Sequence, residues 1–141
     1  MAGLQRKNQN TMPYRAGGTI PNYRIVIPGA TDDAVILATA PAQNLLGVTY
    51  LPLSDIDPLP VGTTGETTEA VAGDLVDVVC DGNPDVEYGG TVGRGVALTT
   101  DSAGRAVAAA NGNTVLGFAG SDAVLGDIAP MIIDRTKIVP A

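Results

Sequence analysis

Apolar and polar positions in residues 89–133 alternate over short runs instead of following a helical period. Runs rich in Val, Ala and Leu are separated about every eight to twelve residues by turn-forming residues. The separators are Gly89-Gly90, residues 101–104, residues 111–113 and residues 120–122. Glycine, Asn and Asp tolerate positive φ and support tight turns. This spacing predicts a mainly β protein, a small antiparallel barrel or sandwich of the β-tulip or jelly-roll type.

The same reading places strands along the rest of the chain. The expected strands are 23–27, 34–38, 45–51, 69–80, 86–88, 92–98, 106–110, 115–119 and 128–133. Residues 53–68 read as a surface loop, because prolines at 52, 58 and 60 are incompatible with a central strand. No repeat of fixed period is evident.

Residues 1–33 are expected to form an extended N-terminal arm, and residues 34–141 a β-rich domain. Prolines at 13, 21 and 28 disfavour helix, and Gly17-Gly18 adds freedom. Tyrosines among cations and prolines are typical of interface anchors, so we expect this arm to order on a partner. The residues expected to make contact are Arg6, Lys7, Pro13, Tyr14, Arg15, Tyr23, Arg24, Ile25 and Ile27. For the first ten residues a disordered terminus is the alternative.

Aromatic residues make up only 4% of the chain, and Trp is absent. A core of Val, Ile, Leu and Ala is thin, so an oligomer is expected to add buried area. The small-residue strand 106–110 and the apolar run 128–133 are its candidate interface. The residues expected there are Val107, Ala109, Ile128, Met131 and Ile133.

Charge is distributed unevenly along the chain, whose net charge is −7. The residues before Asp32 carry four cations and no acid, whereas all 15 acids and four cations follow. An acidic body repels phosphate, which argues against nucleic-acid binding through it. The N-terminus lacks the apolar core of a signal peptide, and no apolar run is long enough to span a membrane. The single Cys80 is expected to be a small buried hydrophobe.

The residue inventory argues against an enzyme. The chain has no His, so Ser-His-Asp and Cys-His arrangements are impossible. Acidic residues alternate over positions 81–87 like the start of a calcium loop, but Val86 stands where that loop needs Gly. We therefore expect a solvated turn there and no metal, cofactor or catalytic site. Paired carboxylates for glycoside cleavage remain an alternative that the sequence leaves open.

The series GGTVGRGVALTTDSAGRAVAA (89–109) and GNTVLGFAGSDAVLGD (112–127), followed by an apolar strand, resembles the capsid decoration (cement) proteins of tailed bacteriophages. The shared features are the glycine pair before a Gly-x-Val entry and a Thr-Asp-x-x-Gly hairpin. A Val-x-Gly-x-Ala strand and a Gly-Asp before the last strand complete them. The resemblance covers about residues 72–133, and it is a pattern of turns and small residues.

The resemblance implies a structural virion protein on the outer surface of a phage head, made in the host cytoplasm. Such a protein stabilises the capsid lattice by clamping neighbouring major capsid subunits. It also implies a homo-oligomer, a trimer in preference to a dimer. The extension before residue 34 and the loop 53–68 are additions to the family pattern. The alternative function is a virion-borne receptor- or glycan-binding β-domain.

Overall fold

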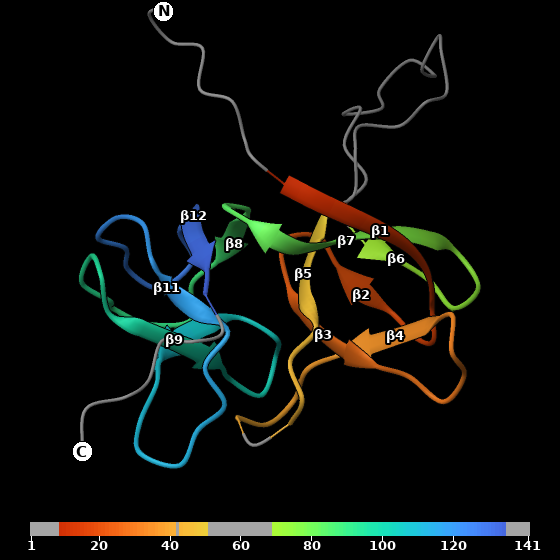
Figure 1. Cartoon of the computed structure of the whole chain (residues 1–141), viewed down its shortest axis with the longest axis horizontal. Helices are drawn as coiled ribbons and strands as arrows, with labels where there is room; N and C mark the ends of the chain where they lie inside the picture. The colour runs from red at the N-terminus through yellow and green to blue at the C-terminus, as the bar shows by residue number, and fades with distance from the viewer. Residues whose placement is uncertain (1–8, 42, 51–68, 135–141) are drawn as a thin grey trace, which may run out of the picture.

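The computed structural model of the 141-residue chain describes residues 9–41, 43–50 and 69–134. Over these residues the protein forms twelve β-strands and no helix (Figure 1). The described residues thus contain no helix with the length and apolarity to cross a bilayer. The prediction of a mainly β fold with a small barrel is confirmed.

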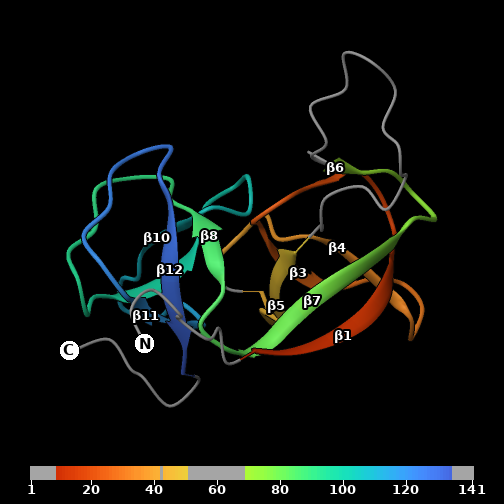
Figure 2. The same ribbon diagram turned by 90° about the horizontal axis from the view of Figure 1, so that it is seen from above.

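The described residues between 9 and 82 form a closed five-stranded barrel, the N-terminal barrel. Its strand order is β1-β4-β3-β5-β7. The bounds are β1 Gln9–Ala16, β3 Ile25–Pro28, β4 Ala34–Leu37, β5 Gly47–Tyr50 and β7 Leu75–Gly82. The short strands β2 Ile20–Pro21 and β6 Glu69–Ala70 pair across one end. Figure 2 shows β1 lying alongside β7 over their length.

Residues 85–133 form a second five-stranded unit, the C-terminal sheet, with the order β10-β9-β11-β12-β8. The bounds are β8 Asp85–Glu87, β9 Ala97–Thr100, β10 Ala106–Ala108, β11 Gly117–Ala119 and β12 Ile128–Ile133. A parallel bridge between Tyr88 and Ala106 links the end of β8 to β10. The two units lie side by side (Figure 1).

The hydrophobic residues form two cores. The first fills the N-terminal barrel and includes Val26, Val35, Val76 and Val78, with the partly buried Cys80 packed against it. The second fills the C-terminal sheet and extends onto the N-terminal barrel. Strand alternation explains this extension. Side chains of β3, β5 and β7 that point out of the barrel are buried in the second core, namely Ile25, Ile27, Val48 and Val79.

The two halves of the chain repeat the same strand pairings. Antiparallel hairpin β3–β4 corresponds to β9–β10, β5 to β11, β7 to β12 and β1 to β8. The register agrees as well. The pair Val48–Val79 corresponds to Phe118–Ile132, Arg15–Leu75 to Glu87–Ile128, and the parallel pair Ala16–Val35 to Tyr88–Ala106. The short pair Ile20–Ala70 corresponds to the bridge Val92–Ala123.

Backbone hydrogen bonds repeat in the same way. Ala16 N–H donates to Asp74 O at 2.8 Å, and Tyr88 N–H donates to Asp127 O at 2.7 Å. The carbonyls of Ala16 and Tyr88 accept from Gly73 and Gly126, each at 2.8 Å. At another equivalent pair, Gly47 and Gly117, any Cβ would collide with the carbonyl oxygen of the partner strand, Val79 O or Ile132 O. The two halves are therefore structural repeats of one five-stranded unit, an internal duplication of structure.

One expectation from the sequence needs correction. Residues 9–33 do not form an arm separate from the body, because they supply β1, β2 and β3 of the N-terminal barrel. A repeat is present, although its period is not fixed. The pair Gly47/Gly117 is 70 residues apart and the pair Ala70/Ala123 is 53 residues apart, so the β5–β6 connection is 17 residues longer than its counterpart.

Candidate contact surfaces

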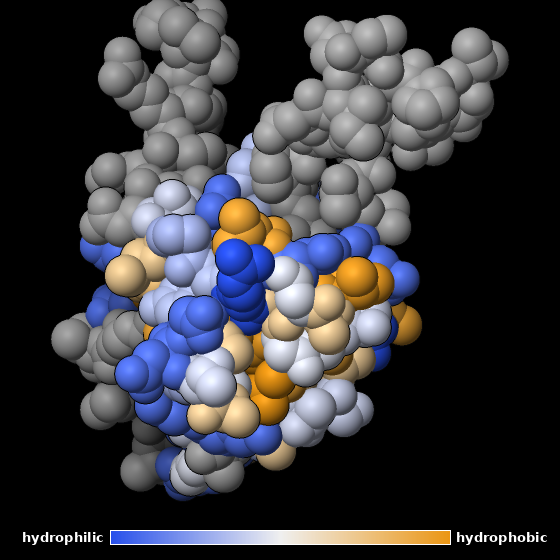
Figure 3. Space-filling model, turned by 90° about the vertical axis from the view of Figure 1, so that its right-hand side faces the viewer, coloured by the Kyte–Doolittle hydropathy of each residue, from blue (hydrophilic) through white to orange (hydrophobic). Residues whose placement is uncertain are grey.

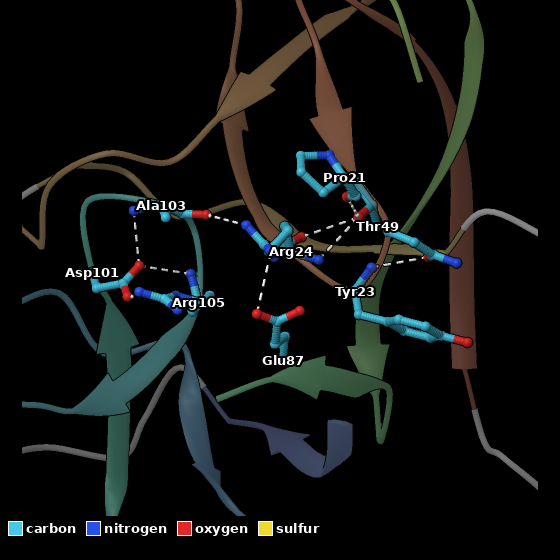
Figure 4. Close-up of polar contacts among 9 residues, drawn as sticks. Pro21, Tyr23, Arg24, Thr49, Glu87, Asp101, Ala103 and Arg105 are labelled. Atoms are coloured by element: carbon cyan, nitrogen blue, oxygen red, sulfur yellow. Dashed lines mark hydrogen bonds and ion pairs between the residues drawn. The ribbon is translucent and has the colours of Figure 1, made fainter. Parts of the chain in front are cut away.

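Arg24 joins the two halves of the molecule. Its guanidinium donates from Nη1 to Ala103 O at 2.9 Å and pairs through Nη2 with Glu87 Oε2 at 3.2 Å. Only 17% of the Arg24 side chain and 23% of the Glu87 side chain is exposed. Figure 4 shows these contacts between the turn before β3 and the C-terminal sheet. Arg24, expected to grip another molecule, instead connects two parts of its own chain.

The backbone around Arg24 supports this junction. Ile25 N–H donates to Gly104 O at 2.7 Å, and Glu87 N–H donates to Tyr23 O at 2.9 Å. Tyr23 has a φ of 60°, which is unusual for a residue other than glycine. Asn22 Oδ1 accepts from Tyr23 N–H at 2.9 Å and helps to hold this conformation. The Tyr23 ring points away from the Arg24–Glu87 pair (Figure 4).

The expected arm residues have different fates in the fold. Ile25 is fully buried and Ile27 is 9% exposed, so neither can contact a partner, and their assignment is wrong. Tyr14 packs against the core of the N-terminal barrel. Pro13 and Arg15 are exposed on β1, where Arg15 Nη1 donates to Gly73 O at 3.0 Å. Arg6 and Lys7 lie outside the described residues.

The expected oligomer-interface residues divide between the two sides of the C-terminal sheet. Ile128 is 51% exposed, and Val107 and Ala109 are partly exposed. Met131 and Ile133 are buried in the core, so their assignment to an interface is wrong. The reason is the period of two along β12, which turns successive side chains to opposite faces. The sequence run 128–133 carries this signal. Strict alternation places Ile132 on the same face as Ile128, and its neighbours Met131 and Ile133 on the opposite face.

The outer face of the C-terminal sheet is the side away from its core. Ala97, Phe118 and Ile132 lie in register across β9, β11 and β12, with Thr99 and Val107 paired beside them. Ile132 is 39% exposed, Phe118 is partly buried, and Ala97 and Thr99 are buried. Thr99 Oγ1 has no hydrogen-bond partner within the described part of the chain. These five side chains carry no charge, in a protein of net charge −7.

Other exposed apolar side chains are scattered. Leu75, the most exposed of them, and Val71 flank the turn between β6 and β7. Figure 3 shows small apolar areas bordered by hydrophilic side chains on the side of the molecule that carries β4 and β6. This distribution is ordinary for a protein surface and does not define a site.

Polar chemistry in the described residues serves mainly to hold turns. A shallow hollow beside residues 91–93 and 122–127 contains two carboxylates. Asp122 Oδ1 accepts from Arg94 N–H at 2.8 Å, and Asp127 Oδ2 accepts from Val124 N–H at 3.0 Å. No group of three potential metal ligands comes together in the ranges that the structure covers. The carboxylates therefore act as turn caps.

Comparison with known proteins identifies a related fold. The chain is similar to the head fiber gp8.5 N base of bacteriophage phi29, with a TM-score of 0.60 and 22% sequence identity. The superposition covers 94% of this chain and 99% of that one. No protein-family model matches the sequence, and neither does any curated protein.

Proposed function

We propose that this protein is a structural component of a phage virion that attaches to the outside of the head. The observation that carries the proposal is the fold, which matches a phage head fiber base over almost the whole length of both chains. The sequence resemblance to capsid decoration proteins points independently to the same location. The acidic composition suits an outer surface, where the body is remote from packaged DNA.

We further propose that the protein stabilises the capsid lattice by bridging neighbouring major capsid subunits. Residues 9–33 belong to the barrel, so we assign the tether to the part of the predicted arm before β1, which carries Arg6 and Lys7. The exposed Pro13 and Arg15 on β1 are proposed to add to the same contact. In a homo-oligomer, for which a trimer is favoured, several weak tethers act together, because one bound tether raises the local concentration of the others.

The proposal is tested by adding purified protein to empty phage heads that lack it and measuring cosedimentation and resistance to heat. We expect binding to heads and a higher temperature of head disruption. The double variant Arg6→Glu/Lys7→Glu should lose most of the binding, because each reversed charge repels an acidic capsid surface. The matched control Arg135→Glu/Lys137→Glu reverses two cations near the other end of the chain and should bind normally.

Several results would contradict these proposals. Failure to bind heads, combined with binding to host cells, would favour the receptor- or glycan-binding alternative. Binding without any rise in heat resistance would remove the bridging role. Equal binding by both double variants would exclude the N-terminal tether. Removal of residues 1–8 is the largest deletion that spares β1, and circular dichroism confirms that the barrel is retained.

A further inference from the structure

The duplication provides a direct comparison between two equivalent surfaces. Four of the outward side chains of β3, β5 and β7 are Ile25, Ile27, Val48 and Val79. Each is at most 9% exposed, because this face of the N-terminal barrel is covered by the C-terminal sheet. One copy of the repeated unit is thus already in contact with the next copy through this face.

The corresponding positions of the C-terminal sheet form its outer face. In register, Ala97 replaces Ile25, Thr99 replaces Ile27, Phe118 replaces Val48 and Ile132 replaces Val79. The positions keep their uncharged character, but no third unit follows in the described chain. Ala97 and Thr99 are buried like their counterparts, and Phe118 is partly buried. The clear difference is at Ile132, which is 39% exposed where Val79 is fully buried.

The β9–β10 hairpin, which contacts the start of β3 beside this face, also has a counterpart. In the intrachain contact, the β9–β10 hairpin reaches β3 through Ala103 O and Gly104 O. A Cβ on Gly104 would collide with Leu37 Cδ1, which shows how closely the hairpin approaches. Its counterpart is the β3–β4 hairpin, residues 29–33. Ala30, Asp32 and Asp33 are exposed there.

We propose that the outer face of the C-terminal sheet binds the β3–β4 hairpin of a second copy of this chain, repeating the contact that joins the two halves. Each chain then carries one face and one hairpin. Such an interface is heterologous, and successive copies associate head to tail until the rotation closes a ring. This inference concerns the free protein and does not depend on attachment to a head.

Charge favours a second copy as the occupant. The hairpin 29–33 carries two carboxylates and no cation, so it requires a surface without acids. The part of the outer face formed by Ala97, Phe118 and Ile132 meets this requirement, whereas the acids of the same side, Asp85 and Glu87, lie on β8 at its edge. Arg94 is exposed in the turn that corresponds to the turn before Arg24. One intrachain contact, the ion pair between Arg24 and Glu87, is not reproduced between copies. Val96 occupies the position equivalent to Arg24, and Arg15 occupies the position equivalent to Glu87. Contact between copies is therefore expected to be weaker than the intrachain contact.

The experiment measures the mass of the free protein by sedimentation velocity and native mass spectrometry, without heads. We expect the full chain to form one discrete oligomer. Ile132→Glu places a charge in the face and should be monomeric, whereas Leu125→Glu, at a side chain 63% exposed in a nearby turn, should associate like the wild type. Ala30→Arg alters the hairpin and should also be monomeric.

Mixing the two interface variants distinguishes this arrangement from a symmetric one. Each variant retains one intact half of the interface, so the mixture should yield a one-to-one dimer that cannot grow. If both variants are monomeric alone and the mixture stays monomeric, the head-to-tail arrangement is wrong. Thermal unfolding confirms that each variant is folded. If Ile132→Glu does not fold, Ile132→Thr should weaken association by roughly tenfold or more.

Two other occupants are outcomes of the same experiment. A chain ended at Asp134 tests residues 135–141, which are separated from β12 by Asp134 alone. If the full chain is monomeric and the shortened chain associates, the C-terminal segment covers the face in place of a second copy. If both are monomeric at all attainable concentrations, self-association through this face is excluded and the face is left to another protein.

Discussion

Tyr88 shows how one residue links the packing of the C-terminal sheet to pH. Its side chain is fully buried, and its hydroxyl donates to Pro130 O at 3.1 Å. Burial, with a smaller contribution from the negative charge of Asp85, raises the pKa of Tyr88 to about 12. The neutral phenol is the form that the folded state holds.

We predict that stability falls at high pH because of this residue. The unfolded chain loses the phenol proton near pH 10, whereas the folded protein keeps it until about pH 12. The contribution is therefore complete below pH 10 and is lost as the pH rises toward 12, with a total of about 3 kcal/mol. Denaturant unfolding of the wild type and of Tyr88→Phe, measured from pH 8 to 12, checks this. Parallel pH profiles for the two proteins would contradict it.

Single residues also show what the sequence could not reveal. Arg24 and Ile25 lie in a basic segment with several prolines, and this composition predicted an arm. The prediction failed because local composition carries no information about distant partners. Glu87 and Gly104, which receive these residues, lie more than sixty positions away. Pro13 and Arg15 are exposed on β1 although this strand pairs with both β4 and β7, so their exposure was compatible with the same reading.

At the scale of elements, the turns before β7 and β12 are nearly identical. In each, a Val N–H donates to an Asp Oδ2 three residues later at 3.0 Å, Val71 to Asp74 and Val124 to Asp127. The intervening glycines, Gly73 and Gly126, have φ values of 92° and 88°. An L-residue adopts this conformation only with strain, although open space surrounds both positions.

We therefore predict matched effects of Gly73→Ala and Gly126→Ala. Each substitution should lower the free energy of unfolding by about 1–2 kcal/mol, because the cost arises from backbone conformation and not from a clash. Gly90→Ala is the control, since Gly90 also has open space but no positive φ. Chemical denaturation measures all three. A cost at only one turn would show that the two turns are not energetically equivalent.

Most strands could be predicted from the spacing of turn residues, because turn chemistry is local. Expected strands overlap β3 to β12, and β12 matches its predicted range. The pairing of strands and the duplication could not be predicted. Residues 89–92 read GGTV where residues 17–20 read GGTI, but the interval between equivalent positions shortens along the chain. A search for a fixed period misses such a repeat.

At the scale of the whole molecule, the second core makes the two halves one folding unit. Ile25 belongs to the N-terminal barrel by its strand and to the core of the C-terminal sheet by its side chain. A change in this residue should therefore be felt in both halves.

We predict that Ile25→Ala lowers the free energy of unfolding by about 2–4 kcal/mol and reduces hydrogen-exchange protection equally in β3 and in β9, β11 and β12. Ile36→Ala, at a side chain 37% exposed in the same barrel, should cost less than about 1 kcal/mol. Native-state hydrogen exchange followed by mass spectrometry gives the comparison. Loss of protection in the N-terminal barrel alone would show that the halves unfold separately.

Joining two units in one polypeptide has a consequence for how they diverge. In an assembly of identical chains that each contain one unit, a mutation changes every unit. In this chain, a mutation changes only one of the two units. Arg15 and Glu87 already show this, because they occupy the same place with opposite charge. The longer β5–β6 connection likewise belongs to one unit only. In an assembly of this chain, the N-terminal and C-terminal units therefore alternate. The assembly presents two chemically different kinds of unit although it contains only one kind of subunit.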